Sequence, residues 1–151
     1  MLQTPKVYRD PVRYRGHRTD QGCLVEVLPE RMEGVRAIGI PLRHWVRHSP
    51  TGFEWGYGGS GPADLARSIL AHHLGDVLPS PRVYQRFKEK VIATFARQND
   101  GQHWEISSGH VAAQLEVIMD EIGAKCPICC DSGYEPESQK KCRCNSEPDY
   151  E

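Results

Sequence analysis

Two closely spaced pairs of cysteines in the carboxyl-terminal part of the chain constrain its fold more than any other feature. Cys126 and Cys129 form the first pair, and Cys142 and Cys144 form the second pair after twelve intervening residues. Four thiolates can surround a tetrahedral Zn²⁺ when the intervening loop folds back. Because such a site leaves no open coordination position, we expect one structural Zn²⁺ per chain and not a catalytic one.

Disulfides and unused free thiols are the alternatives to zinc. Five of the six cysteines lie in this short tail and only Cys23 lies elsewhere, so disulfides within the tail could not cross-link the main body. Residues 1–15 lack the apolar run of a signal peptide, which favours a reducing cytoplasm. We therefore favour zinc over disulfides.

The residues around the first pair carry a longer pattern, which reads Cys126-Pro127-Ile128-Cys129-Cys130-Asp131-Ser132-Gly133-Tyr134. Followed by Cys-x-Cys, this pattern resembles small zinc domains, or zinc knuckles, of phage and bacterial proteins such as helicase loaders. On that alignment Cys130 occupies a variable position and is not a ligand. Gly133 suits a loop position with positive φ. The resemblance implies metal binding but no particular activity.

The length of the chain, 151 residues, is enough for one ordinary domain and a small appendage. We expect a domain over residues 1–123 and a zinc knuckle over residues 124–151. No apolar stretch approaches the roughly 20 residues that a membrane-spanning helix requires, so we expect no membrane partner.

The amino-terminal half has the short apolar runs and turn residues of a small antiparallel sheet. We expect strands over residues 24–28 and 35–40, with a weaker one over 12–15. The run 53–57 places Phe53, Trp55 and Tyr57 at every second position, which predicts a strand with all three rings on one side.

The second half has the periodicity of helices. One helix is expected to begin near Pro62, with Asp64 near its positive end, and to end before Gly75. A second helix is indicated by apolar residues from Val83 to Phe95. A third carries Val111, Leu115, Ile118 and Ile122, begins at Ser107 or Ser108, and ends at Gly123. The fold class is therefore α+β, a small antiparallel sheet followed by three helices and a carboxyl-terminal zinc knuckle.

The segment from Phe53 to Ala66 contains a distinctive pattern, Phe-x-Trp-Gly-Tyr-x-Gly-Ser-Gly-Pro-x-x-Leu-Ala. It resembles the signature of an uncharacterised domain family that is common in bacteria and their phages. The resemblance extends from about Tyr14 to Ile122 and includes the run Trp104-Glu105-Ile106. It implies a phage or mobile-element setting, and hence the cytoplasm of a bacterial host, without an activity.

The same segment has two physical interpretations. Backbone N–H groups at Gly58, Gly59, Ser60 and Gly61, just before a helix, could hold an anion. The pattern lacks the Lys-Ser/Thr of a nucleotide-binding loop, however. We favour the alternative that the glycines allow a tight corner between a strand and a helix around Trp55 and Tyr57.

Basic residues are concentrated in the amino-terminal third. Residues 1–50 have a charge balance of +4, residues 101–151 have one of −6, and the whole chain has a net charge of −1. This net charge argues against a strong general DNA-binding protein. A local contact surface for nucleic acid or a partner is still predicted, made of Arg13, Arg15, Arg18, Arg43, Trp45 and Arg47.

Histidines and serines do not assemble into a recognisable catalytic group. His44 and His48 could form a metal pair, but a solvated basic edge is the simpler interpretation. We find no catalytic residues and consider a small-molecule substrate unlikely. The first hypothesis is a non-enzymatic, zinc-binding accessory protein of a phage or mobile element that binds nucleic acid or a nucleic-acid-processing protein. The second is a protein-directed inhibitor or modulator of a host defence system, and the third is an enzyme centred on the glycine-rich corner.

Overall fold

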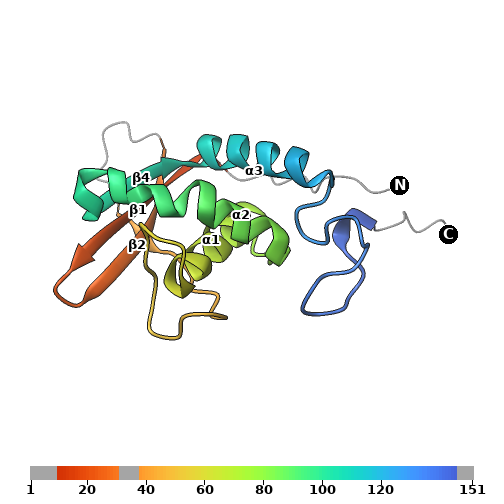
Figure 1. Cartoon of the computed structure of the whole chain (residues 1–151), viewed down its shortest axis with the longest axis horizontal. Helices are drawn as coiled ribbons and strands as arrows, with labels where there is room; N and C mark the ends of the chain where they lie inside the picture. Colours follow the sequence, from red (N-terminus) through yellow and green to blue (C-terminus); the bar gives the residue numbers. More distant parts are fainter. Residues whose placement is uncertain (1–9, 31–37, 146–151) are drawn as a thin grey trace.

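The computed structural model describes residues 10–30 and 38–145. Within them, four strands form one antiparallel sheet in the order β3-β2-β1-β4 (Figure 1). β1 (Val12–Thr19) and β2 (Gly22–Pro29) form a hairpin at its centre, and β3 (Ile40–Pro41) and β4 (His103–Ser107) are the two edges. The expected strands over residues 12–15 and 24–28 are confirmed.

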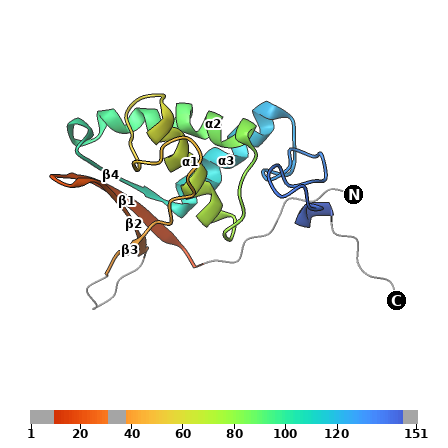
Figure 2. The same cartoon turned by 90° about the horizontal axis from the view of Figure 1, so that it is seen from below.

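Three α-helices lie on one face of the sheet (Figure 2). They are α1 (Ser60–His73), α2 (Pro81–Lys90) and α3 (Ser108–Ile122), and the short 3₁₀ helices are η1 (Ile92–Arg97), η2 (Asn99–Gly101) and η3 (Arg143–Asn145). This arrangement confirms the predicted α+β class. It also places every helix and the cysteine-rich segment on the same side of the hairpin.

The core lies between the sheet and the helices. Tyr14, Val25 and Trp104 point from three neighbouring strands toward the helices and are 0–3% exposed. The ring of Trp104 stacks on Phe95 at 4.2 Å between centroids and meets Trp55 edge-on at 5.7 Å. These aromatic contacts fix η1 and the loop before α1 against the sheet.

Local signals set the ends of two helices as predicted. α1 is followed by Gly75 at φ +82, where the backbone N–H groups of residues 74–76 bond back to the last turn. Ser107 caps the start of α3, where its side chain accepts a hydrogen bond from the N–H of His110, and Gly123 in the left-handed region follows the last residue of the helix.

The second helix is shorter than expected. α2 ends at Lys90, and the chain continues as the 3₁₀ helix η1. The carbonyl of Ile92 accepts a hydrogen bond from the N–H of Gly56, and the hydroxyl of Thr94 donates to the carbonyl of Val91. Because a carbonyl here bonds to a distant loop and β-branched residues cluster at this point, the α-helical pattern does not extend to Phe95.

The predicted strand over residues 53–57 is wrong. Trp55 is 1% exposed but Tyr57 is 52% exposed, so the three aromatic rings do not share one face. The carbonyl of Trp55 and the N–H of Gly56 bond to Arg18 and Ile92, not to a neighbouring strand. Gly56 has a φ of +87, which bends the chain there.

Two further differences concern strand order. Part of the expected strand over residues 35–40 lies outside the described residues, and Ile40 begins β3. The run at Trp104 forms β4, so the sheet is completed after α2 and not before the helices. A strand of five residues with one core-facing Trp and one core-facing Ile alternates too briefly to stand out in the sequence.

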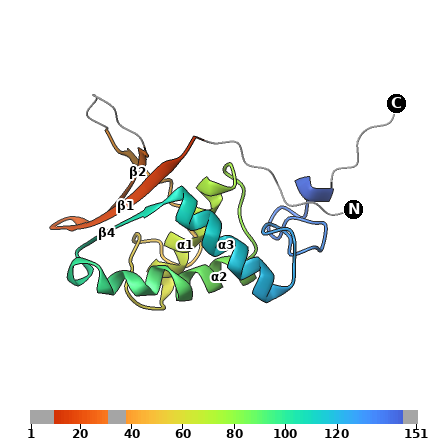
Figure 3. The same ribbon diagram turned by 90° about the horizontal axis from the view of Figure 1, so that it is seen from above.

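The cysteine-rich segment follows α3 and lies beyond the end of that helix (Figure 3). It is docked on the helical layer, because the N–H of Ser80, the residue before α2, bonds to the carbonyl of Pro127 at 2.9 Å. Ile128 is fully buried in the same contiguous apolar cluster as the helices. The division into two units at Gly123 stays a prediction.

Candidate metal centre

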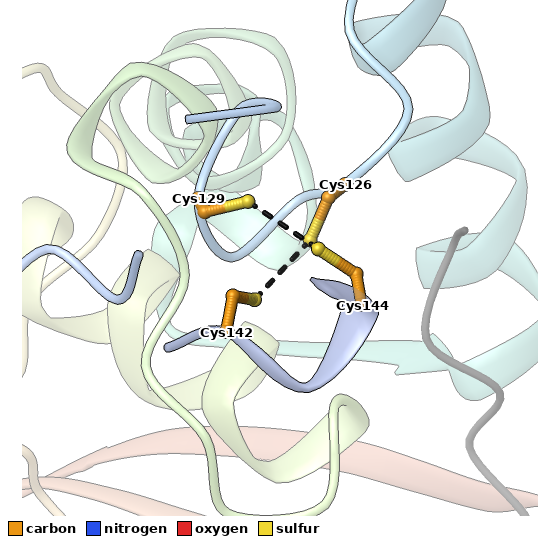
Figure 4. Close-up of side chains that lie close together, drawn as sticks. All are labelled: Cys126, Cys129, Cys142 and Cys144. Carbon is orange, nitrogen blue, oxygen red and sulfur yellow. Dashed lines mark hydrogen bonds between the residues drawn. The ribbon is translucent and has the colours of Figure 1, made fainter. Parts of the chain in front are cut away.

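Four cysteine side chains converge at the carboxyl-terminal end of the described chain, and all four are buried (Figure 4). Their Sγ atoms lie within 4.8 Å of one another, with Cys126 and Cys142 at 3.7 Å and Cys129 and Cys144 at 3.5 Å. A tetrahedral Zn²⁺ with Zn–S bonds of about 2.3 Å separates its sulfur ligands by about 3.8 Å. The four residues that the spacing singled out are thus positioned to hold one metal ion.

Backbone geometry points N–H groups at the sulfur atoms. The N–H groups of Ile128 and Cys129 hydrogen-bond to the Cys126 sulfur, and the N–H of Gly133 hydrogen-bonds to the Cys129 sulfur. Gly133 has a φ of +86, which is the conformation that its sequence context predicts. Such bonds stabilise thiolates, the form of cysteine that binds a metal.

Asp131 holds the turn that contains the first cysteine pair. Its carboxylate accepts hydrogen bonds from the N–H of Lys125 at 2.9 Å and from the N–H of Cys126 at 2.9 Å. The N–H of Cys130 bonds to the carbonyl of Cys126, which closes the same turn. This arrangement explains the aspartate of the sequence pattern as a structural residue.

The electrostatics of the cluster favour a bound cation. Burial raises the pKa of Cys126 to about 12 and also raises the pKa of Cys144. Burial acts in the same direction on Cys129, but the N–H of Gly133 and the neighbouring thiols bring the pKa of Cys129 below its ordinary value. Several thiolates in this apolar surrounding need a compensating positive charge, which a divalent cation with sulfur affinity supplies.

The remaining two cysteines are not part of the cluster. Cys130 is half-buried at a φ of +48, and Cys23 lies on β2. Burial and the carboxylate of Glu54 raise the pKa of Cys23 to about 11, which makes its thiol unreactive.

An ion pair between a buried arginine and an exposed glutamate joins the loop between the two cysteine pairs to α1. Arg67 is 4% exposed, and its guanidinium donates to both carboxylate oxygens of Glu137, at 2.5 and 3.2 Å. Arg47 adds a third hydrogen bond to Glu137 at 3.1 Å. This contact was not expected from the sequence, in which the only signal is that a charged residue, Arg67, stands between the apolar pairs Leu65-Ala66 and Ile69-Leu70.

Asp64 organises the loop before α1, a role that differs from the expected favourable charge at a helix end. Its side chain is fully buried and accepts hydrogen bonds from the N–H groups of Arg47, His48 and Ser49. His44 Nε2 also bonds to Asp64, at 2.8 Å. Burial alone would raise the pKa of Asp64, but these hydrogen bonds, above all the one with His44, outweigh it and lower the pKa.

The two loop histidines do not form a metal pair. His44 contacts Asp64, whereas His48 Nε2 lies 2.7 Å from the hydroxyl of Tyr84 on α2. The two rings therefore serve separate polar contacts between the loop and the helices.

Most of the arginines predicted as a contact surface have carboxylate partners within the chain. Arg13 pairs with Glu105 and Arg15 with Glu26, on the face of the sheet that points away from the helices. Arg18 points the other way and bonds to Glu54 and to the carbonyl groups of Trp55 and Gly101, while Arg47 pairs with Glu137, as described above. The six predicted residues do not form one continuous patch, because β1 divides Arg13 and Arg15 from Arg18.

Arg43, which is exposed, and Trp45, which is half-buried, form a separate unit. The Arg43 guanidinium carbon lies 3.4 Å from the centroid of the Trp45 ring, and no carboxylate among the described residues pairs with Arg43. The backbone N–H of Trp45 bonds to Ser68, and its carbonyl bonds to Arg67.

The glycine-rich corner is closely packed. A Cβ atom at Gly61 would overlap the side chain of Glu54, and one at Gly59 would overlap the Tyr57 ring, whereas Gly58 has free space. None of these three glycines has a positive φ; Gly56 does. Packing therefore accounts for Gly59 and Gly61, and the bend that we expected from them is made by Gly56.

A groove of about 1080 Å³ runs along α3 between the end of α1, the start of β1 and the cysteine-rich segment. Its apolar lining includes Val12, Leu74, Ala112, Leu115, Val117 and Pro127. Both the main body and the cysteine-rich segment contribute to its walls.

Comparison with known proteins gives a family but no activity. Residues 14–117 match the family described as Family of unknown function (DUF6166), and the chain belongs to that family. No curated protein and no solved structure matches the chain. No helix among the described residues is long and apolar enough to cross a membrane.

Proposed function

We propose that this member of the DUF6166 family is a zinc-stabilised binding module whose ligand is another protein. The observation that carries the proposal is the convergence of four buried sulfur atoms on one point, in a segment that also forms a wall of the groove along α3. The metal then has a structural purpose, since it holds that wall against the body.

Zinc is the ion that the ligand set favours. Four thiolates in tetrahedral arrangement select Zn²⁺ or iron among common metals, and magnesium and calcium require oxygen ligands. Cys126, Cys129, Cys142 and Cys144 would hold the ion, and it would supply charge compensation and a cross-link between the two ends of the loop.

A protein partner fits the charges better than nucleic acid does. Arg13, Arg15, Arg18 and Arg47 already pair with carboxylates of the same chain, so a phosphate would have to displace those partners. The net charge of −1 adds no general attraction to a polyanion. A groove with an apolar lining instead suits burial of apolar side chains from a protein.

The groove is tested by two matched substitutions. Val117 lines it and is 47% exposed, whereas Val46 is 52% exposed but lies in the loop before α1. Zinc-loaded wild-type, Val117→Glu and Val46→Glu proteins would be used to capture partners from lysates of cells that carry the gene. We expect Val117→Glu to lose a protein that wild type and Val46→Glu both retain, with zinc content and melting temperature unchanged.

Nucleic-acid contact is the second candidate, and one specific observation favours it. The exposed Arg43 guanidinium stacks on the half-buried Trp45 ring, and an arginine and an aromatic ring are the groups that contact a phosphate and a base. Fluorescence anisotropy with short single- and double-stranded DNA and RNA at low salt separates the candidates. Micromolar binding that weakens steeply with salt and is abolished in Arg43→Glu would replace the protein-partner proposal with this one.

A further inference from the structure

The contact between Glu137 and Arg67 links the metal site to a surface segment on the main body. Arg67 Nη1 and Nη2 bind the Glu137 carboxylate, while Nε of the same guanidinium donates to the carbonyl of Trp45 at 3.1 Å. The Arg67 side chain is only 5% exposed, whereas that of Glu137 is 35% exposed, so the contact lies where the buried helix meets the solvent-accessible loop. One buried guanidinium thus contacts the metal-binding segment and the segment 43–47 at the same time.

Glu137 is held in place by the loop between the cysteine pairs. This loop is a narrow hairpin, in which the N–H of Glu135 bonds to the carbonyl of Lys140 at 2.8 Å and Tyr134 pairs with Lys141. The N–H of Cys142 bonds to the carbonyl of Gly133 at 2.8 Å, so the base of the hairpin includes one of the four metal-binding cysteines. Most of its residues are exposed, and its side chains bury little apolar surface. Its position therefore depends on the cross-link at its base.

The segment 43–47 depends in turn on α1. The backbone of Trp45 forms hydrogen bonds with the side chains of Ser68 and Arg67. The Arg43 guanidinium stacks on the Trp45 ring. Trp45 and residues 135–138 of the hairpin also line a second groove. If Glu137 moves away, Arg67 loses the one carboxylate partner that it has among the described residues, and the Trp45 carbonyl loses a fixed donor.

We propose that Glu137 is a positioning residue through which occupancy of the four-cysteine site sets the conformation of the Arg43–Trp45 segment. The metal orders the hairpin, the hairpin places the Glu137 carboxylate on Arg67, and Arg67 holds Trp45. The site then acts as a metal-dependent control on the surface formed by the exposed Arg43 and the half-buried Trp45. This inference rests on the metal-binding part of the proposed function and is independent of the groove along α3.

The test uses full-length protein in which all three tryptophans are labelled with 5-fluorotryptophan. The variant Trp45→Phe identifies the ¹⁹F resonance of Trp45, and the resonances of Trp55 and Trp104 report on the core, where both side chains are buried. Spectra of zinc-loaded wild type, Glu137→Gln and Glu135→Gln are compared. Glu135 is the matched control because it lies in the same hairpin but its side chain contacts Ser138, not Arg67.

We expect Glu137→Gln to shift or broaden the Trp45 resonance while the other two resonances keep their positions, and Glu135→Gln to leave all three unchanged. Removal of zinc from wild type should move the Trp45 resonance in the same direction as Glu137→Gln. If Glu137→Gln leaves Trp45 where it is in wild type, or if Glu135→Gln shifts it equally, the coupling is refuted.

A second measurement uses the reciprocity of coupled equilibria. If bound zinc favours the contact between Glu137 and Arg67, then that contact must favour zinc binding by the same factor. Loss of the contact should therefore weaken zinc affinity on the order of five-fold or more, the range typical of coupled binding sites. Competition with a chromophoric zinc chelator should show this loss in Glu137→Gln and not in Glu135→Gln. Equal zinc affinity in wild type and Glu137→Gln contradicts the inference even though zinc is bound, whereas absence of zinc from wild type contradicts the proposed function itself.

Discussion

Replacement of Asp64 by Asn tests whether one buried carboxylate holds the loop before α1. Oδ2 accepts from His44 Nε2 and from the N–H groups of Arg47 and Ser49, at 2.8, 3.3 and 3.0 Å, and Oδ1 accepts from the N–H of His48 at 2.9 Å. An Asn side chain has the same shape but only one acceptor oxygen. In either orientation its NH₂ group faces at least one buried donor.

The expected loss of stability is worked out for the less costly orientation of the Asn amide, in which its NH₂ group faces the backbone N–H of His48. One charge-assisted hydrogen bond is then lost and its donor left unsatisfied, at about 1–3 kcal/mol, and the three remaining bonds weaken because the acceptor is neutral. We expect Asp64→Asn to lower the free energy of unfolding by about 3 kcal/mol. For a chain of this length that corresponds to a fall in melting temperature of about 6–12 °C.

The assay is urea denaturation followed by circular dichroism, with Asp120→Asn as the control. Asp120 is exposed on α3, so its substitution removes the same charge and should change stability by less than about 0.5 kcal/mol. A loss below about 1 kcal/mol in Asp64→Asn, or an equal loss in Asp120→Asn, would refute the reasoning.

The pH dependence gives a further check on Asp64. Its pKa is lower in the folded chain than the ordinary value of about 3.9, so the ionised group stabilises the fold above that pH. This contribution is lost as the pH falls through the folded pKa. The stability difference between wild type and Asp64→Asn should therefore be constant near neutral pH and decrease below about pH 4. Protonation of the cysteines cancels in this comparison, because both proteins have the same four-cysteine site.

Two other predictions concern packing. Gly16 lies against the indole of Trp104, so Gly16→Ala should destabilise the fold by about 1–3 kcal/mol, whereas Gly58→Ala, at a position with free space, should have little effect in the same urea denaturation assay. Equal stability of the two variants would contradict the close approach of β1 to Trp104. Truncation after Gly123 should leave a cooperative fold that is less stable by about 2–4 kcal/mol, chiefly because the buried Ile128 side chain is lost. A truncated chain that is unfolded, or as stable as the full chain, would argue against docking of this kind.

The sequence predicted the parts of the molecule that depend on local patterns. The spacing of Cys126, Cys129, Cys142 and Cys144 indicated their convergence, since four soft ligands leave few ways to fold the intervening loop. Helix ends at Gly75 and Gly123 were predictable because glycine there adopts the left-handed conformation. Short apolar or alternating runs indicated parts of the two central strands, over residues 12–15 and 24–28, but not their pairing as a hairpin.

Contacts between distant residues were not predictable in this way. Nothing local distinguishes Glu137, in an exposed acidic loop, from Glu135, although only Glu137 meets the buried Arg67. The basic residues looked like a contact surface because sequence does not show that Arg18 turns toward Glu54 and Arg47 toward Glu137. The aromatic run over residues 53–57 resembled a strand because alternation alone does not show that Gly56 bends the chain.

The metal content of the purified protein tests the central claim most directly. Protein prepared under reducing conditions without chelators is analysed by inductively coupled plasma mass spectrometry, alongside the double variant Cys126→Ser/Cys129→Ser and the single variant Cys130→Ser. The account predicts about one zinc per chain in wild type and in Cys130→Ser, and none in the double variant. Wild-type protein without metal, or equal loss of zinc from Cys130→Ser, would contradict it.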